Sequence, residues 1–227
     1  MSGELIDTSE MYLRTIYELH EEDIEPLRAR IVERLHHSGP TVSQTVNRLA
    51  RDGLLSIEDD RHLELSDFGW RTAVSVMRKH RLAECMLFEQ LGMPWDVLHD
   101  EACRLEHVMS DEMEARLTET LGDPKFGPYG TPIPPADLNV DPDDFRAGVV
   151  ALSQIVDDSE GPYKLVRLSE FVQAHDGALS ELFAAGIMPA FEFEATMSDR
   201  RLDLQGPDAA ATLPEFLADG IWVAHQG

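Results

Sequence analysis

The chain has 227 residues, of which 43% are hydrophobic, so it can form one large domain or two to three small ones. No apolar run approaches the ~20 residues that span a bilayer, and residues 1–4 lack the basic and apolar regions of a signal peptide. We therefore expect a cytoplasmic protein with no membrane partner. Two cysteines are too few for a disulfide framework, which leaves Cys103 free to act as a ligand in a reducing compartment.

The net charge of −24 argues against a protein that binds polyanions over its whole surface. The charge is unevenly placed, however. Residues 27–51 carry a net charge of +4, so the rest of the chain carries −28. A basic segment on an acidic body is compatible with DNA binding that stays weak until a signal strengthens it.

Three short helices are predicted at the start of the chain. A capping signal at residues 7–10 begins the first, the second spans residues 26–35, and the third spans residues 41–51. Short alternating runs at residues 54–57 and 62–65, separated by a polar turn, predict a hairpin. Three helices and a hairpin in this order predict a winged helix-turn-helix.

The third helix has an apolar face formed by Val42, Val46 and Leu49 and a polar face on the opposite side. In a winged helix-turn-helix the polar face enters the major groove of DNA. The expected groove residues are Ser38, Pro40, Thr41, Ser43 and Gln44, and the expected phosphate contacts are Arg28, Arg48, Arg51 and Arg61. The alternative is a three-helix unit used only for packing, which leaves the polar face unexplained.

Two later segments carry rows of metal-binding side chains. His80 and Glu84 lie on a long helix that begins after Ser66, and the chain then breaks at residues 92–94. A second predicted helix, residues 95–121, carries His99, Cys103, Glu106 and His107. Side chains three or four residues apart share a helix face, so each helix presents several donors on one side.

Imidazole, carboxylate and thiolate groups bind first-row divalent ions, and two facing helices can surround one ion. The alternative is a surface hydrogen-bonded pair, solvated side chains and an ordinary buried cysteine. The same two helices carry more apolar residues than one helix pair needs to bury, which indicates a dimer interface. These residues are Leu82, Met86, Leu87, Leu91, Val97, Leu98, Val108 and Leu117.

The second half of the chain has a different character. Residues 122–142 are rich in Pro and Gly, which predicts a linker or a draped loop. Predicted strands follow at residues 163–168, 191–195, 201–204 and 220–224, with a short helix at 177–185. We expect a small β-barrel. The sequence contains no P-loop, dinucleotide fingerprint or nucleophile elbow.

Several long polar motifs resemble the diphtheria toxin repressor family, the iron-dependent regulators of actinobacteria. The N-terminal motifs are DTSEMYLRTIY at residues 7–17, PLRARI at 26–31 and SGPTVSQTV at 38–46. They are followed by MRKHRLAE at 77–84, HDEAC at 99–103 and EHVMS at 106–110. The resemblance is strong over residues 4–121 and weaker beyond.

The resemblance implies a mainly α fold with a small β part. Its expected parts are a winged helix-turn-helix DNA-binding domain (1–72), a helical dimerisation and metal-binding domain (73–140), a linker (141–159) and an SH3-like β-barrel (160–227). It also implies two metal sites per subunit. A regulatory site would use Met11, Cys103, Glu106 and His107, and an ancillary site His80, Glu84, His99, Glu170 and Gln173.

A thioether and a thiol beside imidazole and carboxylate make a site softer than those that suit manganese, which favours Fe(II). Mn(II), Co(II), Ni(II) or Zn(II) are expected as substitutes in vitro. The resemblance implies a homodimer that represses iron-uptake and iron-homeostasis genes. Its partner would be a palindromic duplex operator that binds one or two dimers.

The sequence departs from the family in three respects. Leu105 replaces a tryptophan, and Gly127 and Thr131 replace a serine and an asparagine that help to hold an anion, so Arg81 is left for that contact. The third departure is the strong acidity, which predicts that DNA binding requires metal or moderate salt. Three alternatives remain: a manganese-responsive regulator of this architecture, a metal-dependent hydrolase, and a regulator that senses an organic ligand.

Overall fold

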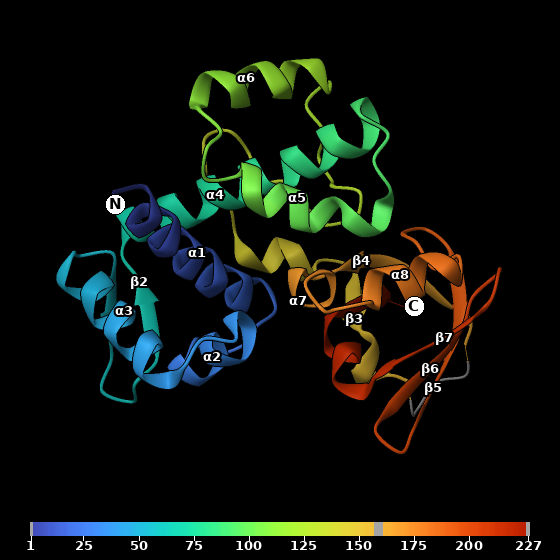
Figure 1. Cartoon of the computed structure of the whole chain (residues 1–227). Helices are drawn as coiled ribbons and strands as arrows, with labels where there is room; N and C mark the ends of the chain where they lie inside the picture. Colours follow the sequence, from blue (N-terminus) through green and yellow to red (C-terminus); the bar gives the residue numbers. More distant parts are fainter. Residues whose placement is uncertain (1, 157–160, 226–227) are drawn as a thin grey trace.

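The computed structural model describes residues 2–156 and 161–225, with side chains from Thr8 onward. Three groups of elements follow one another along the chain and meet around the C-terminal end of α1 (Figure 1). No helix in the described part of the chain is long and apolar enough to cross a membrane.

The N-terminal part is a winged helix-turn-helix. It comprises α1 (Ser2–Glu21), α2 (Arg28–Leu35), α3 (Gly39–Arg51), β1 (Leu55–Ile57) and β2 (Leu63–Leu65), and the two strands pair antiparallel. Val42, Val46 and Leu49 are fully buried, which confirms the predicted inner face of α3. They pack with Tyr12, Ile16 and Ile31 in a separate small core.

All three predicted helix starts in this part are displaced, the third from Thr41 to Gly39. The first helix begins at Ser2, before the predicted cap at Asp7. A residue type that favours a cap can also lie inside a helix, so the capping signal alone does not fix where the helix begins. The second begins at Arg28, two residues after Pro26. In the third, the Ser38 hydroxyl accepts a hydrogen bond from the Thr41 amide, so the helix begins at Gly39.

The dimerisation part is built on α4 (Asp67–Cys85), which Ser66 caps as predicted. A π-helical turn (Met86–Gln90) and a short 3-10 helix (Trp95–Val97) lead into α5 (Leu98–Leu105) and α6 (Asp111–Thr120). The predicted single helix over residues 95–121 is therefore wrong. The Ser110 hydroxyl accepts from the Met113 amide and caps α6, so the chain turns between residues 106 and 110.

The Pro- and Gly-rich segment after α6 is a draped loop. Its carbonyl oxygens accept hydrogen bonds from side chains of the helices below: Pro128 from Trp95, Pro132 from Arg81 and Pro134 from Arg78. These contacts fix the loop against α4 and the residues that lead into α5.

The C-terminal part is a six-stranded antiparallel sheet in the order β3-β8-β4-β5-β6-β7. The strands are β3 (Val149–Ala151), β4 (Tyr163–Leu168), β5 (Glu192–Ser198), β6 (Arg201–Gln205), β7 (Ala210–Pro214) and β8 (Ile221–Ala224). The short helices α7 (Glu170–Gln173) and α8 (Ala178–Ala184) follow β4, and 3-10 turns lie at Pro142–Arg146, Leu152–Gln154 and Glu215–Gly220. β4 pairs first with β5 and then with β8, and β3 and β7 do not pair in the described part.

β3 falls inside residues 141–159, which the sequence assigned to a linker. Its pairing with β8 makes it an edge strand of the sheet. The sequence did not predict this strand, because three residues (Val149, Val150 and Ala151) are too few to show an alternating pattern. The predicted linker also includes residues 157–160, which lie outside the described residues. The predicted strands at 163–168, 191–195, 201–204 and 220–224 are confirmed within two or three residues at their ends.

One continuous apolar core joins the dimerisation helices to the C-terminal sheet. Leu82, Trp95 and Leu98 belong to the same buried cluster as Leu165 and Leu182 of the C-terminal part. The Trp95 ring also stacks on Phe183 of α8. The C-terminal part is therefore docked on the helices by apolar contact, and it is not only tethered to them by the loop.

Gly69 sets how closely α4 approaches the wing. A Cβ atom at this residue would lie 1.9 Å from the Leu54 carbonyl oxygen. We expect Gly69→Ala to reduce the free energy of unfolding by about 1–3 kcal/mol, because the backbone must shift to admit the methyl group. Gly39→Ala is the matched control, since a Cβ there meets nothing within 4 Å. Urea unfolding followed by circular dichroism measures both, and equal midpoints for the two variants would contradict the expected contact.

Candidate metal centre and DNA-binding surface

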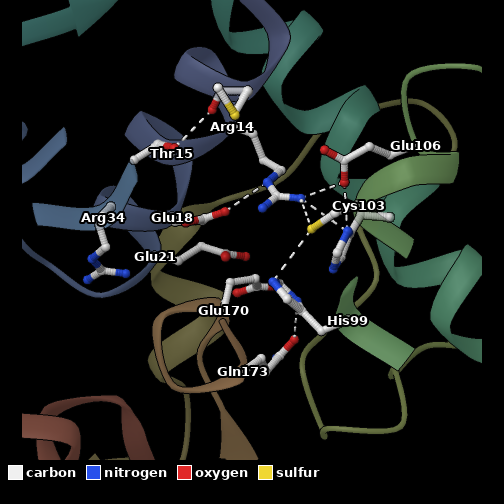
Figure 2. Close-up of polar contacts among 12 residues, drawn as sticks. Arg14, Thr15, Glu18, Glu21, Arg34, His99, Cys103, Glu106, Glu170 and Gln173 are labelled. Carbon is white, nitrogen blue, oxygen red and sulfur yellow. Dashed lines mark hydrogen bonds and ion pairs between the residues drawn. The ribbon is translucent and has the colours of Figure 1, made fainter. Parts of the chain in front are cut away.

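The predicted metal ligands come from all three parts of the chain. Met11 lies on α1, His80 and Glu84 on α4, and His99 and Cys103 on α5. Glu106 and His107 follow directly after α5, and Glu170 and Gln173 are the first and last residues of α7. Figure 2 shows His99, Cys103 and Glu106 facing Arg14 of α1, with Gln173 next to His99.

The tightest group of donors combines residues that the sequence assigned to different sites. His80, His99 and Cys103 each place a ligand atom within 4.8 Å of the others. The two imidazole rings stand edge to face with centroids 4.9 Å apart, and His99 Nε2 lies 3.5 Å from Cys103 Sγ. Glu84 Oε1 contacts His80 Nε2 at 2.8 Å. A single small region therefore contains nitrogen, sulfur and oxygen donors.

Glu106 joins this group to His107. Glu106 Oε2 lies 2.6 Å from His80 Nδ1, and its Oε1 lies 3.1 Å from His107 Nε2. His107 Nδ1 also contacts Glu10 Oε2 at 2.7 Å, which ties α1 to the end of α5.

Met11 is partly buried and lines a cavity of about 830 Å³ between α1, α2, α5 and α7. Cys103, Glu106 and His107 line the same cavity. All four residues of the predicted regulatory site therefore border one space. No polar contact ties the Met11 thioether to the other three in the described residues.

The two C-terminal residues of the predicted ancillary site behave differently from each other. Gln173 contacts His99, with Oε1 3.0 Å from Nδ1, while its amide nitrogen donates to the Leu168 carbonyl. Glu170 is instead an ion-pair partner of Arg81, at 2.8 Å from Nη2. In this arrangement Glu170 faces a guanidinium and not the His80–Glu84 pair.

The expected role of Arg81 in binding an anion is not met in this structure. Its side chain is completely buried, and its guanidinium donates to Glu21, to Glu170 and to the Pro132 carbonyl. Glu21 and Glu170 supply the negative charge that an external anion would bring. Every nitrogen of this guanidinium is thus already engaged, so no donor faces a free anion.

Sequence reasoning missed Arg14, which lies at the middle of the ligand group. Its Nη1 atom is 3.1 Å from His80 Nδ1, 3.6 Å from Cys103 Sγ and 2.5 Å from Glu106 Oε2. Its Nε atom lies 2.9 Å from Glu18 Oε1 (Figure 2). The available signal was its spacing of three residues from Met11, which places both on one helix face.

Burial and neighbouring charges strongly shift the pKa values of these side chains. Burial alone would raise the pKa of the Cys103 thiol, but His99, Arg14 and His80 outweigh it and hold that pKa well below its ordinary value. Burial likewise opposes ionisation of Glu84, yet His80 lowers its pKa to about 2. The thiol and the carboxylate are therefore in the anionic forms that bind metals.

The two histidines are held in the opposite state. Burial lowers the pKa of His99, but the Cys103 thiolate and Glu84 outweigh it and raise that pKa to about 10. His80 shows the same balance, with Glu84 raising its pKa well above the ordinary value. Protons on His80 and His99 thus neutralise the anions, and a metal ion would have to displace them.

One orphaned atom supports the fit of a cation. Glu84 Oε2 is buried and has no hydrogen-bond partner, although its pKa indicates that the carboxylate is charged. Buried charged oxygens without a partner are costly, and coordination by a cation removes that cost. The nitrogen, sulfur and oxygen donors around it form the set that Fe(II), Co(II), Ni(II) and Zn(II) accept.

The DNA-binding residues predicted from the sequence share one exposed surface at α3 and the wing. Ser38, Pro40, Thr41 and Gln44 are exposed, and Ser43 is partly exposed. Arg51 and Arg61 are exposed near the end of α3 and at the tip of the wing turn, while Arg28 donates to Asn47 of α3. Arg48 donates to the Ser9 hydroxyl on α1 at 3.1 Å, so one predicted phosphate contact also joins α3 to α1.

Comparison with known proteins supports both a DNA-binding part and a metal-binding part. Residues 4–63 match the family model described as the N-terminal DNA binding domain of iron dependent repressors. Residues 66–135 match the model of their metal binding and dimerisation domain.

Two curated relatives cover most of the chain. The chain is 44% identical over 234 residues to the diphtheria toxin repressor of Corynebacterium jeikeium, which covers 97% of this chain and 98% of the relative. It is 51% identical over 190 residues to the iron-dependent repressor IdeR of Mycobacterium tuberculosis, which covers 82% of this chain and 83% of the relative.

Solved structures show the same architecture. A manganese-dependent transcriptional repressor in complex with manganese has a TM-score of 0.76 at 28% identity, covering 96% of this chain and 100% of that one. The IdeR structure from T. acidophilum has a TM-score of 0.74 at 25% identity, covering 96% and 97%. With the sequence matches over both functional domains, these findings show that the chain belongs to the iron-dependent repressor family, whose members are metal-dependent DNA-binding transcriptional repressors and not enzymes.

Proposed function

We propose that this repressor uses Fe(II) as its co-repressor and acts on iron-uptake and iron-homeostasis genes. The observation that carries the proposal is a group of thioether, thiolate, imidazole and carboxylate donors that come from α1, α4, α5 and the turn after α5. This group lies next to the winged helix-turn-helix, of which α1 is part. A thiolate in the set favours Fe(II) over Mn(II), which prefers oxygen ligands. The iron-dependent names of the relatives at 44% and 51% identity point the same way.

We assign two metal sites to each subunit, as the family resemblance implies. Met11, Cys103, Glu106 and His107 would hold one ion, and His80, Glu84, His99, Glu170 and Gln173 the other. Bound ions supply positive charge that draws these donors together. The contact of Gln173 with His99 supports the second set, whereas Glu170 would have to leave Arg81 to join it.

Metal binding would reach the DNA-binding surface through α1. Met11 is on α1 and its proposed co-ligands are on α5 and just beyond it, so joint coordination fixes the distance between these helices. Arg48 of α3 donates to Ser9, two residues before Met11. The orientation of α3 therefore depends on the position of α1, and affinity for DNA rises with the population of the matching pose.

We also propose that the repressor is a homodimer bound to a palindromic operator. Leu82, Leu87, Leu98 and Leu117, which the sequence offered for the interface, are buried within the chain instead. Leu91, Val97 and Val108 remain exposed on the dimerisation part, where Phe88 and Met113 add to them. A two-fold pair formed on this surface presents two α3 helices to two half-sites.

At moderate salt we expect the protein to bind operator DNA only when metal is bound. Cys103→Ala and Met11→Ala should each abolish Fe(II)-dependent retardation of a palindromic iron-box duplex, because a ligand to the regulatory ion is lost. Cys85→Ala is the matched control, since that thiol lies in the apolar core and donates its hydrogen bond to the Phe126 carbonyl, not to a proposed ligand. The measurement is an anaerobic gel shift with Fe(II), Mn(II) and chelator arms. Equal binding in chelator would refute the switch, and a preference for Mn(II) would favour the manganese-responsive alternative.

The stoichiometry of the same complex tests the assembly. Analytical ultracentrifugation of the metal-loaded protein on the duplex should give two subunits per operator, or four if two dimers bind. A single bound subunit would contradict the homodimer. Retention of DNA affinity with chelator and loss of it with a small organic molecule would instead support a regulator that senses an organic ligand.

Base contacts and phosphate contacts should separate in their salt dependence. Gln44→Ala is expected to weaken specific binding by about 1–3 kcal/mol with little change on nonspecific DNA, because an amide that pairs with a base edge is lost. Arg51→Ala should weaken both and reduce the salt slope by about one, because a phosphate contact is lost. Fluorescence anisotropy across a salt series measures both. Identical behaviour of the two variants would contradict the assigned roles.

A further inference from the structure

The guanidinium of Arg14 stands where the proposed ligands converge. A single nitrogen, Nη1, approaches a histidine nitrogen, a cysteine sulfur and a glutamate oxygen at 3.1, 3.6 and 2.5 Å. These three atoms belong to α4, to α5 and to the turn after α5. Convergence of three such donors on one point is the arrangement expected around a metal ion, and here the point is filled by a cation of the chain itself.

We propose that Arg14 is the resident cation of the ligand group in the metal-free protein, and that its guanidinium must leave before a divalent ion can bind there. The inference rests on the proposed function, because it requires Cys103 and Glu106 to be ligands of the regulatory ion, next to His80 of the ancillary site. It adds a residue outside the ligand set that sets the metal affinity by competition.

The two cations cannot occupy the group together. A divalent ion bonded to Cys103 Sγ and Glu106 Oε2 would lie about 2.0–2.3 Å from each of them. The Nη1 atom of Arg14 is already in contact with both of these atoms and with His80 of the neighbouring site, so it fills that space. Binding of an ion therefore requires the side chain to swing away.

Charge explains why a cation is needed when metal is absent. Glu106 is almost completely buried, and its carboxylate faces Arg14 as well as His80. An uncompensated buried carboxylate or thiolate strongly destabilises a folded protein. Arg14 adds its positive charge to that of the two histidines, and a metal ion would supply it in turn once it has displaced the guanidinium.

The structure also offers Arg14 a second resting place. Its Nε atom is paired with Glu18 at 2.9 Å, and Arg14 and Glu18 both line the cavity of about 830 Å³ between the three parts of the chain. This cavity gives the guanidinium space to move into, and Glu18 lies at its edge within ion-pair distance of Arg14.

Cobalt titration of purified protein tests the proposal without using DNA. Coordination of Co(II) by Cys103 produces a thiolate-to-cobalt charge-transfer absorption, which reports occupancy directly. We expect Arg14→Met to bind Co(II) about tenfold more tightly than wild type, which is the factor for a competing arrangement that holds about nine-tenths of the metal-free protein. Methionine removes the charge but adds a thioether that can itself bind Co(II), so Arg14→Leu, which has no donor atom, must show the same gain.

Arg78→Met is the matched control. Arg78 is also a buried arginine, but its partners are Glu114, Thr118 and the Pro134 carbonyl, none of which is a proposed ligand. Its loss should leave the cobalt affinity unchanged. Equal or weaker binding by Arg14→Met relative to wild type would overturn the proposal, because Arg14 would then support the bound ion or be indifferent to it.

A measurement on wild type covers the case in which Arg14→Met does not fold. The Nε–Hε NMR signal of Arg14, assigned by its absence in Arg14→Lys, should shift when diamagnetic Zn(II) is added to two equivalents, which fills both proposed sites. An unchanged signal at full occupancy would overturn the proposal.

The cobalt band separates this inference from the proposed function. If wild type gives the band and Cys103→Ser removes it, the ligand assignment stands and the affinity of Arg14→Met decides the role of Arg14. If wild type binds cobalt without the band, Cys103 is not a ligand, and both the regulatory site and the inference fail.

Discussion

Buried ion pairs between arginines and glutamates hold the three parts of this chain in one arrangement. Arg81 of α4 is bonded to Glu21 of α1 and to Glu170 of α7, so one guanidinium joins all three parts. Removing one partner of such a pair costs about 3–5 kcal/mol, because a buried charge is left without compensation. The relative positions of α1, α4 and α7 are therefore specified by charge as well as by apolar packing.

Further arginines extend this network toward the two functional surfaces. Arg34 of α2 is paired with Glu22, the residue directly after α1, and lies 4.3 Å over the ring of Phe171 on α7, so the C-terminal part touches the helix just before α3. Arg14 reaches in the other direction, from Glu18 to the ligand group. Burial raises the pKa of both Glu18 and Glu21 to about 7, despite their arginine partners, which shows how much desolvation these pairs carry.

The same buried ion pairs involve both the proposed metal ligands and the residues that fix the three parts relative to one another. Glu106 is shared between a guanidinium and two imidazoles, and Glu170, a proposed ancillary ligand, is paired with Arg81. A cation that enters the group must change at least one of these pairs. Since the paired residues lie on α1 and α7, the change is transmitted to the elements that flank the DNA-binding helix and to the C-terminal sheet.

The sequence by itself determined the winged helix-turn-helix and which of the proposed metal ligands share a helix face. Helical spacing placed His80 with Glu84 and His99 with Cys103, because these pairs lie within single helices and local geometry decides their contacts. The inner face of α3 followed from the same periodicity.

Only the tertiary structure decided how these rows meet. His80 contacts Glu106 across 26 residues, and Arg14 contacts Cys103 across 89, so no periodicity within one helix could reveal either pair. The break after α5, the strand at residues 149–151 and the burial of Arg81 depend likewise on long-range packing and on caps that compete with helix continuation. Local spacing fixes which side chains share a face, whereas the cost of burying charge fixes which faces come together.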